Sequence, residues 1–389
     1  MTLPGGRARS ILGALALCMG FASQAAAEAA SAAPPPRIAM LWSSAPGAGS
    51  RIDRWARYRV IVVSPGELGF EWEQQPHKDM ATRLRPESIP RGRATLAKLR
   101  KQNPDALVLC ELYYFEANTS AYPADSPWWF RDKSGRRQEF WKGCRNMAVD
   151  NPEYIEHVAQ RIDAVVAAGE GRVGVFLDNL RYDPASKQGW NALLARVRST
   201  CSDAPILVNA GWDSEGLDWI APQINGVLYE DSIAHTQDND AEAFYARIQR
   251  QGRLCREPRV GVNEVFGHRD DPLAARRELI RTLVYTDLCY LFADSTYGHK
   301  HDWQAEWGAP LGEPLAPPPT PKPGVLARRA FAGGEVLWLP ADAPRSATIS
   351  LAGPRYAVGQ QQPARQLLLN PGEGALLLAE PFVPAAASP

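Results

Sequence analysis

The chain has 389 residues, with 43 basic and 43 acidic side chains and twelve tryptophans. This balanced charge offers no basic surface for nucleic acid or an anionic membrane, so we expect neither as a partner. The length exceeds that of one ordinary compact core and fits a barrel of roughly 250 residues with an appended domain.

The N-terminus is typical of a secretory signal peptide. Arg7 and Arg9 precede an apolar run over residues 11–22, and Ala25-Ala26-Ala27 offers a small-residue cleavage site. The run is shorter than the roughly 18 residues that a membrane-spanning helix needs. We therefore predict no membrane span and a mature protein that is secreted or periplasmic. The predicted segments are a signal peptide over residues 1–27 and a disordered leader over residues 28–36.

Eight short apolar runs rich in β-branched residues recur along the chain, most of them separated by helical stretches. This alternation is typical of a parallel sheet covered by helices, and no glycine-rich phosphate loop follows any run. We therefore predict an α/β fold of the (β/α)₈ TIM-barrel class rather than an open doubly wound sheet. The predicted strands cover residues 37–42, 58–64, 106–114, 173–178, 205–210, 226–231, 259–265 and 288–294, and the predicted helices cover residues 90–102, 152–168, 188–199, 240–252 and 272–286.

The composition changes after the eighth predicted strand. A proline-dense stretch is followed by apolar and polar residues that alternate between glycine and asparagine turns. This pattern predicts a small antiparallel, β-sandwich-like domain that supports the barrel and carries no catalytic groups. The predicted parts are a catalytic barrel over residues 37–313, a linker over 314–324, a β-domain over 325–380 and a disordered tail over 381–389.

Cleavage of the signal peptide would leave five cysteines without a C-x-x-C pair, so we expect no zinc or redox site. Cys110 and Cys289 lie inside apolar runs and are predicted to be buried. Cys201 and Cys255 each precede a predicted strand, and export leaves a disulfide between them open as an alternative to two free thiols.

Polar side chains stand at the carboxyl ends of the predicted strands, where the active sites of barrel enzymes lie. Converging carboxylates repel one another, and a cleft that protonates a leaving oxygen and stabilises positive charge at carbon needs such a group. The alternative is that some of them, such as Asp178 and Asp294, cap the following helices. The candidates are Glu111 and Tyr113 on the third strand, Asp178 and Asn179 on the fourth, Asn209 on the fifth, Glu230 and Asp231 on the sixth, Glu264 on the seventh and Asp294 on the eighth.

Aromatic residues in the predicted loops form a second group of candidates. Aromatic faces stack on the apolar faces of sugar rings, and loop tryptophans have no packing role that the sequence makes evident. The alternative is that some of them close over the top of the barrel. The candidates are Trp128, Trp129 and Trp141 in the long connection after the third strand, followed by Tyr182, Trp212 and Trp303.

His299 and His301, with Asp302 beside them, could suggest a metal site. Metal-dependent barrel hydrolases would carry an H-x-H pair at the end of the first strand, so a structural or substrate-contacting role is favoured here. We expect no metal and no cofactor.

Several segments resemble known families. The stretch WWFRDKSGRRQEFW, the triplet Asp150-Asn151-Pro152, the segment GVFLDN and the run GAPLGEPL resemble hypothetical glycosyl hydrolase family 15. A more distant resemblance, on Asp178-Asn179 and Glu230-Asp231, is to glycoside hydrolase family 114, the endo-α-1,4-polygalactosaminidases. The second resemblance implies that Asp178 is the nucleophile and Glu230 the acid/base. Tyr229 stands where that family commonly has a polar residue.

These observations favour an exported, monomeric glycoside hydrolase that cuts a polysaccharide or exopolysaccharide. Because one strand separates those of Asp178 and Glu230, we expect their carboxyl groups within about 5 to 9 Å of each other. Glu230 is expected to be less solvated and protonated at rest. The alternatives are a catalytically silent carbohydrate-binding barrel and a metal-dependent polysaccharide deacetylase using His299 and His301.

Overall fold

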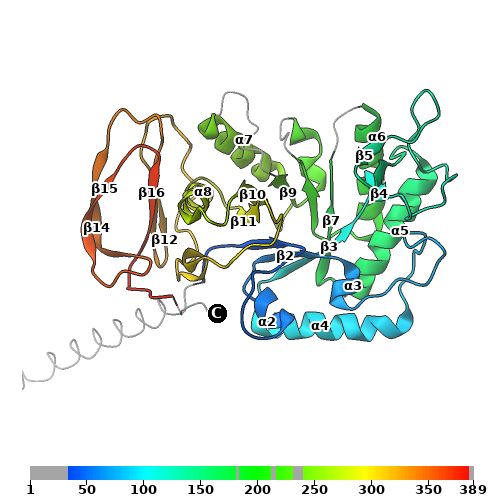
Figure 1. Ribbon diagram of the computed structural model, residues 1–389, viewed down its shortest axis with the longest axis horizontal. Helices are drawn as coiled ribbons and strands as arrows, with labels where there is room; N and C mark the ends of the chain where they lie inside the picture. Colours follow the sequence, from blue (N-terminus) through cyan, green and yellow to red (C-terminus); the bar gives the residue numbers. More distant parts are fainter. Residues whose placement is uncertain (1–33, 181–183, 212–215, 231–239, 385–389) are drawn as a thin grey trace, which may run out of the picture. The chain divides into compact units, whose positions relative to one another are not determined.

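The computed structural model describes residues 34–180, 184–211, 216–230 and 240–384. Its central element is a sheet of eight parallel strands in the order β1-β2-β3-β7-β8-β9-β10-β11 (Figure 1). A parallel bridge between Ile38 and Tyr290 brings the last strand back to the first, so the sheet closes into a barrel. The strands are β1 (Ala39–Leu41), β2 (Val60–Val63), β3 (Leu107–Leu112), β7 (Val173–Leu177), β8 (Ile206–Asn209), β9 (Gly226–Glu230), β10 (Val262–Gly267) and β11 (Cys289–Asp294).

Helices follow most of the strands and lie around the outside of the barrel (Figure 1). In α5, the Asn151 side chain caps the first turn by accepting hydrogen bonds from the backbone N–H groups of Glu153 and Tyr154, and Pro152 occupies the first helical position. The predicted (β/α)₈ fold is confirmed. The helices are α2 (Arg51–Trp55), α3 (Pro65–Leu68), α4 (Ile89–Gln102), α5 (Pro152–Ala168), α6 (Pro184–Thr200), α7 (Ala241–Leu254) and α8 (Pro272–Tyr285), and the short 3₁₀ helices are η1 (Pro86–Ser88), η2 (Leu217–Trp219), η3 (Ala221–Gln223) and η5 (Ala305–Gly308).

Alternate residues of the barrel strands form one apolar cluster that fills the interior. Side chains alternate between the two faces of a strand, so the residue two positions beyond a core residue also faces the interior. This rule determines which strand-end side chains share the mouth of the barrel. The cluster consists of Ala39, Leu41, Val60, Val62, Leu109, Phe176, Leu207, Leu228, Val260, Val262, Cys289 and Leu291.

The long connection between β3 and α5 contains structure of its own. It forms a small antiparallel sheet in the order β4-β6-β5, made of β4 (Glu116–Asn118), β5 (Glu139–Trp141) and β6 (Cys144–Asn146). The buried Trp129 donates its indole N–H to the carbonyl of Pro123 at 2.7 Å and so stabilises the connection from within.

The chain divides into two compact units, and the barrel unit covers Arg37–Gln304 and Pro318–Pro323. The other unit includes Ala305–Pro317 and the chain from Gly324, so residues 305–313, predicted as the end of the barrel, are grouped with the β-domain. This unit holds a five-stranded antiparallel sheet in the order β12-β13-β16-β14-β15. The strands are β12 (Ala327–Phe331), β13 (Gly334–Leu339), β14 (Ala347–Ala357), β15 (Ala364–Leu369) and β16 (Glu373–Leu378).

Strand β14 explains how a single sheet encloses a core. Its first half pairs with β15, its last residues pair with β16, and the register shifts between Ser350 and Arg355. The two halves of the sheet then bury Leu337, Ile349 and Leu377 in one apolar cluster.

All five cysteines of the described chain are free thiols. Cys110 and Cys289 are buried as predicted. A disulfide between Cys201 and Cys255 is absent, because Cys201 contacts the Asp163 carboxylate at 3.3 Å and Cys255 contacts the carbonyl of Gln251 at 3.5 Å. Over the described ranges, no helix combines the length and the apolar character that crossing a membrane requires.

Candidate active site

Five of the predicted polar candidates stand in the first layer above the apolar core, at the carboxyl ends of the strands. Each lies two residues beyond a core residue of its strand, so all five face the interior of the barrel. They are Glu111 on β3, Asp178 directly after β7, Asn209 on β8, Glu230 on β9 and Glu264 on β10.

Asn209 joins the two carboxylates that the sequence singles out. Its side-chain Nδ2 donates one hydrogen bond to Oδ1 of Asp178 and one to Oε2 of Glu230, each at 2.7 Å. Both acceptors bind the same nitrogen, so these two oxygens are at most about 5.4 Å apart. The Asn209 Oδ1 accepts the backbone N–H of Gly211 at 2.7 Å, which fixes the orientation of the amide. The two carboxyl groups therefore face one space at the mouth of the barrel.

Asn179 extends this network to Glu116 on β4. Its backbone has φ 57°, a left-handed conformation that asparagine tolerates better than most residues. Its Nδ2 donates to Oδ2 of Asp178 at 2.9 Å and to Oε1 of the buried Glu116 at 2.7 Å. Asp178 thus receives two side-chain N–H donors, one on each oxygen.

Glu264 is fully buried and pairs with His299, which follows the last strand. His301 is buried as well and lies between two partners. Its Nε2 lies 3.0 Å from the Tyr58 hydroxyl, and its Nδ1 lies 2.9 Å from the carbonyl of His299. Tyr58 also accepts the backbone N–H of Ala45 at 2.7 Å, so its hydroxyl donates to His301. Both imidazoles are therefore held by protein groups. No cluster of three metal-binding side chains occurs among the residues that the structure describes.

Burial dominates the electrostatics of the carboxylates. It raises the pKa of Glu111 to about 8, and the charge of Asp178 adds to the rise. Burial also raises the pKa of Glu264 to about 6, although His299 opposes the rise. Burial raises the pKa of Asp178 too, with a contribution from the Glu230 charge, while the Asn209 hydrogen bond lowers it. The rise on Asp178 differs from the expectation that Glu230 alone holds the resting proton.

These shifts predict that stability falls as the pH rises. Between about pH 4 and 8 the folded protein keeps carboxyl protons that the unfolded chain has lost, so the unfolded chain binds fewer protons and the free energy of unfolding declines. His299 acts in the same direction, because its carboxylate partners raise its pKa despite burial. We expect a loss of roughly 2–5 kcal/mol between pH 5 and pH 9, measured by guanidinium unfolding.

Glu111→Gln is the control for this pH dependence. The amide keeps the size of the side chain and cannot ionise, so the variant should be more stable than the parent at pH 9 and show a shallower slope. An unchanged slope would mean that Glu111 does not contribute to it.

The structure does not bring Asp294 into this group. Leu291 of the same strand faces the core, so Ala293 takes the next inward position and Asp294 faces away. Its carboxylate accepts the backbone N–H groups of Arg269, Thr296 and Tyr297 and pairs with the Arg269 guanidinium at 3.2 Å. These donors overcome its burial and lower its pKa to about 2. It stabilises the turn after β11 and caps no helix, and its role as a substrate contact stays a prediction.

The predicted aromatic residues lie in different surroundings and do not form one group. Tyr113 is partly buried beside Glu111 and Asp178, whose charges add to burial in raising its pKa. Trp129 is buried inside the long connection. Trp303 lies under the Arg57 guanidinium, 3.7 Å from its ring centre, and packs on Tyr58. Trp141 on β5 is 48% exposed. Tyr182, Trp212 and Asp231 lie outside the described residues.

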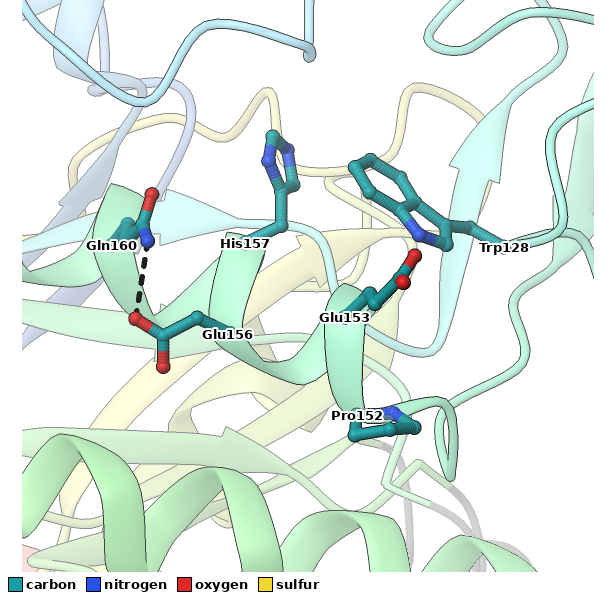
Figure 2. A pocket seen from close by; sticks show the side chains of 6 residues that line it. All are labelled: Trp128, Pro152, Glu153, Glu156, His157 and Gln160. Atoms are coloured by element: carbon teal, nitrogen blue, oxygen red, sulfur yellow. Dashed lines mark hydrogen bonds between the residues drawn. The ribbon is translucent and has the colours of Figure 1, made fainter.

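Trp128 belongs to a different pocket (Figure 2). Its ring packs against His157 of α5, with 4.6 Å between ring centres, and the strand-end carboxylates are not part of the lining. Trp128 and Glu153 project over one end of the pocket in Figure 2, and Glu156 and Gln160 of the same helix lie at the other. The position of Trp128 is therefore explained by packing on α5.

Two residues of the site were missed as direct contacts of the acids. The sequence indicated a structural or substrate-contacting role for His299 but not its pairing with Glu264, and it placed Trp42 only at the end of the first strand. The Trp42 indole lies close enough to Glu111 to oppose the rise in the pKa of that carboxyl, and its ring meets that of His299 edge-on at 4.5 Å. An aromatic residue at the end of the first strand was the available signal for Trp42.

A closed eight-stranded parallel barrel with helices outside it places the chain in the (β/α)₈ barrel class. Among solved structures, it is similar to a cyclic α-maltosyl-(1→6)-maltose hydrolase from Arthrobacter globiformis, with 12% identity over 89% of this chain and 99% of that one and a TM-score of 0.52. It is also similar to a noncanonic maltogenic α-amylase from Thermotoga neapolitana, with 10% identity over 88% and 98% and a TM-score of 0.50. These likenesses establish the fold.

No protein-family model matches the chain, and no curated protein is similar to it in sequence. The resemblance to hypothetical glycosyl hydrolase family 15 and to glycoside hydrolase family 114 stays a prediction.

Proposed function

We propose that this protein is an exported glycoside hydrolase that cuts a polysaccharide with Asp178 as nucleophile and Glu230 as general acid/base. The observation that carries the proposal is the Asn209 amide, which holds one oxygen of each carboxylate at 2.7 Å. The resulting upper limit of about 5.4 Å between these oxygens suits a retaining enzyme, whose carboxyl groups lie roughly 5 to 5.5 Å apart. An inverting enzyme needs room for a water molecule between substrate and base, which this spacing does not favour.

The reaction then follows in two balanced steps. In the first, Glu230 transfers its proton to the glycosidic oxygen while Asp178 forms a bond to the anomeric carbon, so the leaving sugar departs as an alcohol. In the second, Glu230 takes a proton from water, whose oxygen bonds to the anomeric carbon and releases Asp178 as a carboxylate. Glu230 regains its proton, and the net change is hydrolysis of one glycosidic bond.

The hydrogen bonds support this division of roles. Asp178 accepts two side-chain N–H donors, from Asn179 and Asn209, whereas Asn209 is the side-chain donor that Glu230 shares with it. N–H donors favour an ionised carboxylate. Part of the rise in the pKa of Asp178 comes from the charge on Glu230, so it diminishes when Glu230 holds the proton. The proposed mechanism assigns the proton of the pair to Glu230, so that Asp178 is ionised when the substrate binds.

The neighbouring groups have supporting roles in this proposal. The pair of Glu264 and His299 lies close enough to both carboxylates for its charges to act on them. A positive His299 stabilises the ionised Asp178 and, with Glu264, sets the charge of the substrate space. Asn179 holds Asp178 in place, and Tyr113 and Glu111 complete the wall on the third strand.

Export is supported by the pattern of Arg7, Arg9, the apolar run and the alanine cleavage site. In this proposal the mature protein acts as a monomer outside the cytoplasm on a polysaccharide partner. Deacetylation with a metal on His299 and His301 is less favoured, because Glu264 and Tyr58 already bind these imidazoles.

The test is the release of reducing ends from a panel of polysaccharides that includes α-glucans, bacterial exopolysaccharides and amino-sugar polymers. The proposal expects one substrate to be cut and the Asp178→Asn variant to be inactive on it. Binding of a polymer without any release of reducing ends would favour the catalytically silent carbohydrate-binding barrel. Release of acetate in place of reducing ends would favour the deacetylase.

A further inference from the structure

Trp42 has an unusual backbone for a bulky residue. Its φ is 61°, in the left-handed region that side chains other than glycine and asparagine rarely adopt. Its N–H donates to the Val62 carbonyl at 2.9 Å, so the conformation is held by pairing with the second strand. Strained residues of this kind concentrate at functional sites. Asn179, next to Asp178, has the same backbone conformation at the end of another strand.

The strand order places Trp42 across the barrel mouth from the carboxylate pair. In the closed order, β1 is three strands from β7 in one direction and three strands from β9 in the other, so β8 with Asn209 lies opposite β1. An eight-stranded parallel barrel is narrow, because its interior is just wide enough for side chains to fill, so its mouth is narrow as well. A sugar ring that contacts Asp178 and Glu230 therefore extends toward Trp42.

The contacts of Trp42 lead to both carboxylates. Its indole lies close enough to Glu111 to oppose the rise in the pKa of that carboxyl, and Glu111 in turn interacts with the charge of Asp178. Its ring also meets His299 edge-on, and His299 interacts with the charges of Glu230 and Asp178. Trp42 nevertheless remains 38% exposed.

We infer that Trp42 is the aromatic platform of the sugar subsite, where it stacks on the apolar face of a pyranose ring held over the carboxylates. The inference rests on the proposed function. It makes Trp42 a substrate-contacting residue that selects a six-membered sugar ring with one apolar face. Trp129 and Trp303 are less suited to this role, because the first is buried and Arg57 covers the second.

The experiment measures binding of two cationic iminosugars, 1-deoxynojirimycin and 1-deoxygalactonojirimycin, by titration calorimetry. Each probe combines a six-membered ring with a positive charge that suits the acidic site. We expect the wild-type protein to bind at least one, Trp42→Gly to bind it at least about tenfold more weakly, and Trp42→Phe to recover most of the affinity. Phe130→Ala is the matched control, because Phe130 is an aromatic residue at least as exposed as Trp42 and is not a candidate for the sugar site, and it should bind like the wild type.

Stability separates loss of the platform from loss of the fold. Glycine adopts positive φ without penalty, so Trp42→Gly should melt at the same temperature as the wild type or higher. If Trp42→Gly does not fold, Trp42→Ala takes its place, and its iminosugar binding should likewise be at least about tenfold weaker than that of the wild type. The inference is overturned if the folded variant binds as well as the wild type, if Phe130→Ala weakens binding equally, or if the wild type binds neither iminosugar.

Hydrolysis assays distinguish this failure from that of the proposed function. Iminosugar binding that depends on Trp42, without cleavage of any polysaccharide, would leave the subsite intact and refute the hydrolase. Cleavage of a polysaccharide with the same kcat/KM in Trp42→Gly as in the wild type would support the hydrolase and refute the Trp42 subsite.

Discussion

Replacing Asp178 with asparagine or Glu230 with glutamine is expected to remove hydrolysis while leaving the fold intact. Both changes preserve size, and an amide oxygen can still accept the Asn209 hydrogen bond. Glu230→Gln loses the proton donor, which should lower kcat by roughly 10²–10⁴-fold on a substrate with a poor leaving group. Asp178→Asn loses the nucleophile itself, so its kcat should fall to the limit of detection. Reducing-end release and thermal melting measure the two effects.

Chemical rescue distinguishes the two roles. Azide added to Glu230→Ala should enter as the second nucleophile and give a glycosyl azide of retained configuration, whereas azide added to Asp178→Ala should attack directly and give the inverted product. Glu153→Gln, a change to an exposed carboxylate at the start of α5, should leave activity unchanged. The assignment would be refuted if both variants kept more than about a tenth of wild-type kcat.

Asn209→Asp is expected to lower both the stability and the activity of the protein, and the loss of stability should depend on pH. The variant places a third carboxylate where Nδ2 now lies 2.7 Å from the oxygens of Asp178 and Glu230. Asn209 is 4% exposed, so solvent screens the repulsion poorly. We expect a loss of roughly 2–4 kcal/mol at pH 7 and at least about a 10²-fold loss of activity from displaced carboxylates.

The sign of the pH effect follows from linkage. The new carboxyl would have a higher pKa in the folded state than in the unfolded chain, so the loss is small below about pH 4 and grows as the pH rises. Asn209→Ala is the control, because it removes the same donor without adding a charge. If Asn209→Asp and Asn209→Ala lost equal stability at every pH from 4 to 8, the close contact of the three groups would be disproved.

The barrel could be predicted because strand and helix patterns are local properties of the sequence. The run GVFLD is apolar at every position until its end, which is typical of a strand covered on both faces, and it became β7 with Asp178 directly after it. The residue at which the barrel unit ends was harder to predict from the sequence. Residues 305–313 are grouped with the β-domain through contacts distant in the sequence, which composition does not record.

The candidate site was predictable to the extent that it follows strand alternation. Glu111, Asp178, Asn209, Glu230 and Glu264 share the inward parity of their strands, and counting in steps of two from Leu291 would have excluded Asp294. Trp42 breaks the same rule, because Leu41 faces the core and a regular strand would turn the next side chain outward. Its left-handed backbone depends on the pairing with β2, so no property of its neighbours in the sequence announces it.

Of the pairs of neighbouring barrel strands, β1 and β11 are joined by the fewest paired residues, and this pairing is the joint that closes the barrel. A single bridge between Ile38 and Tyr290 connects these strands, whereas the other neighbouring strands pair over three or more residues. Trp42 follows the strand on one side of this joint, and His299 follows the strand on the other. A ligand that contacts both residues would link β1 and β11. By mass action it would stabilise the closed barrel, so the ligand-bound protein would resist local unfolding between β1 and β11, where the unbound barrel has the fewest paired residues.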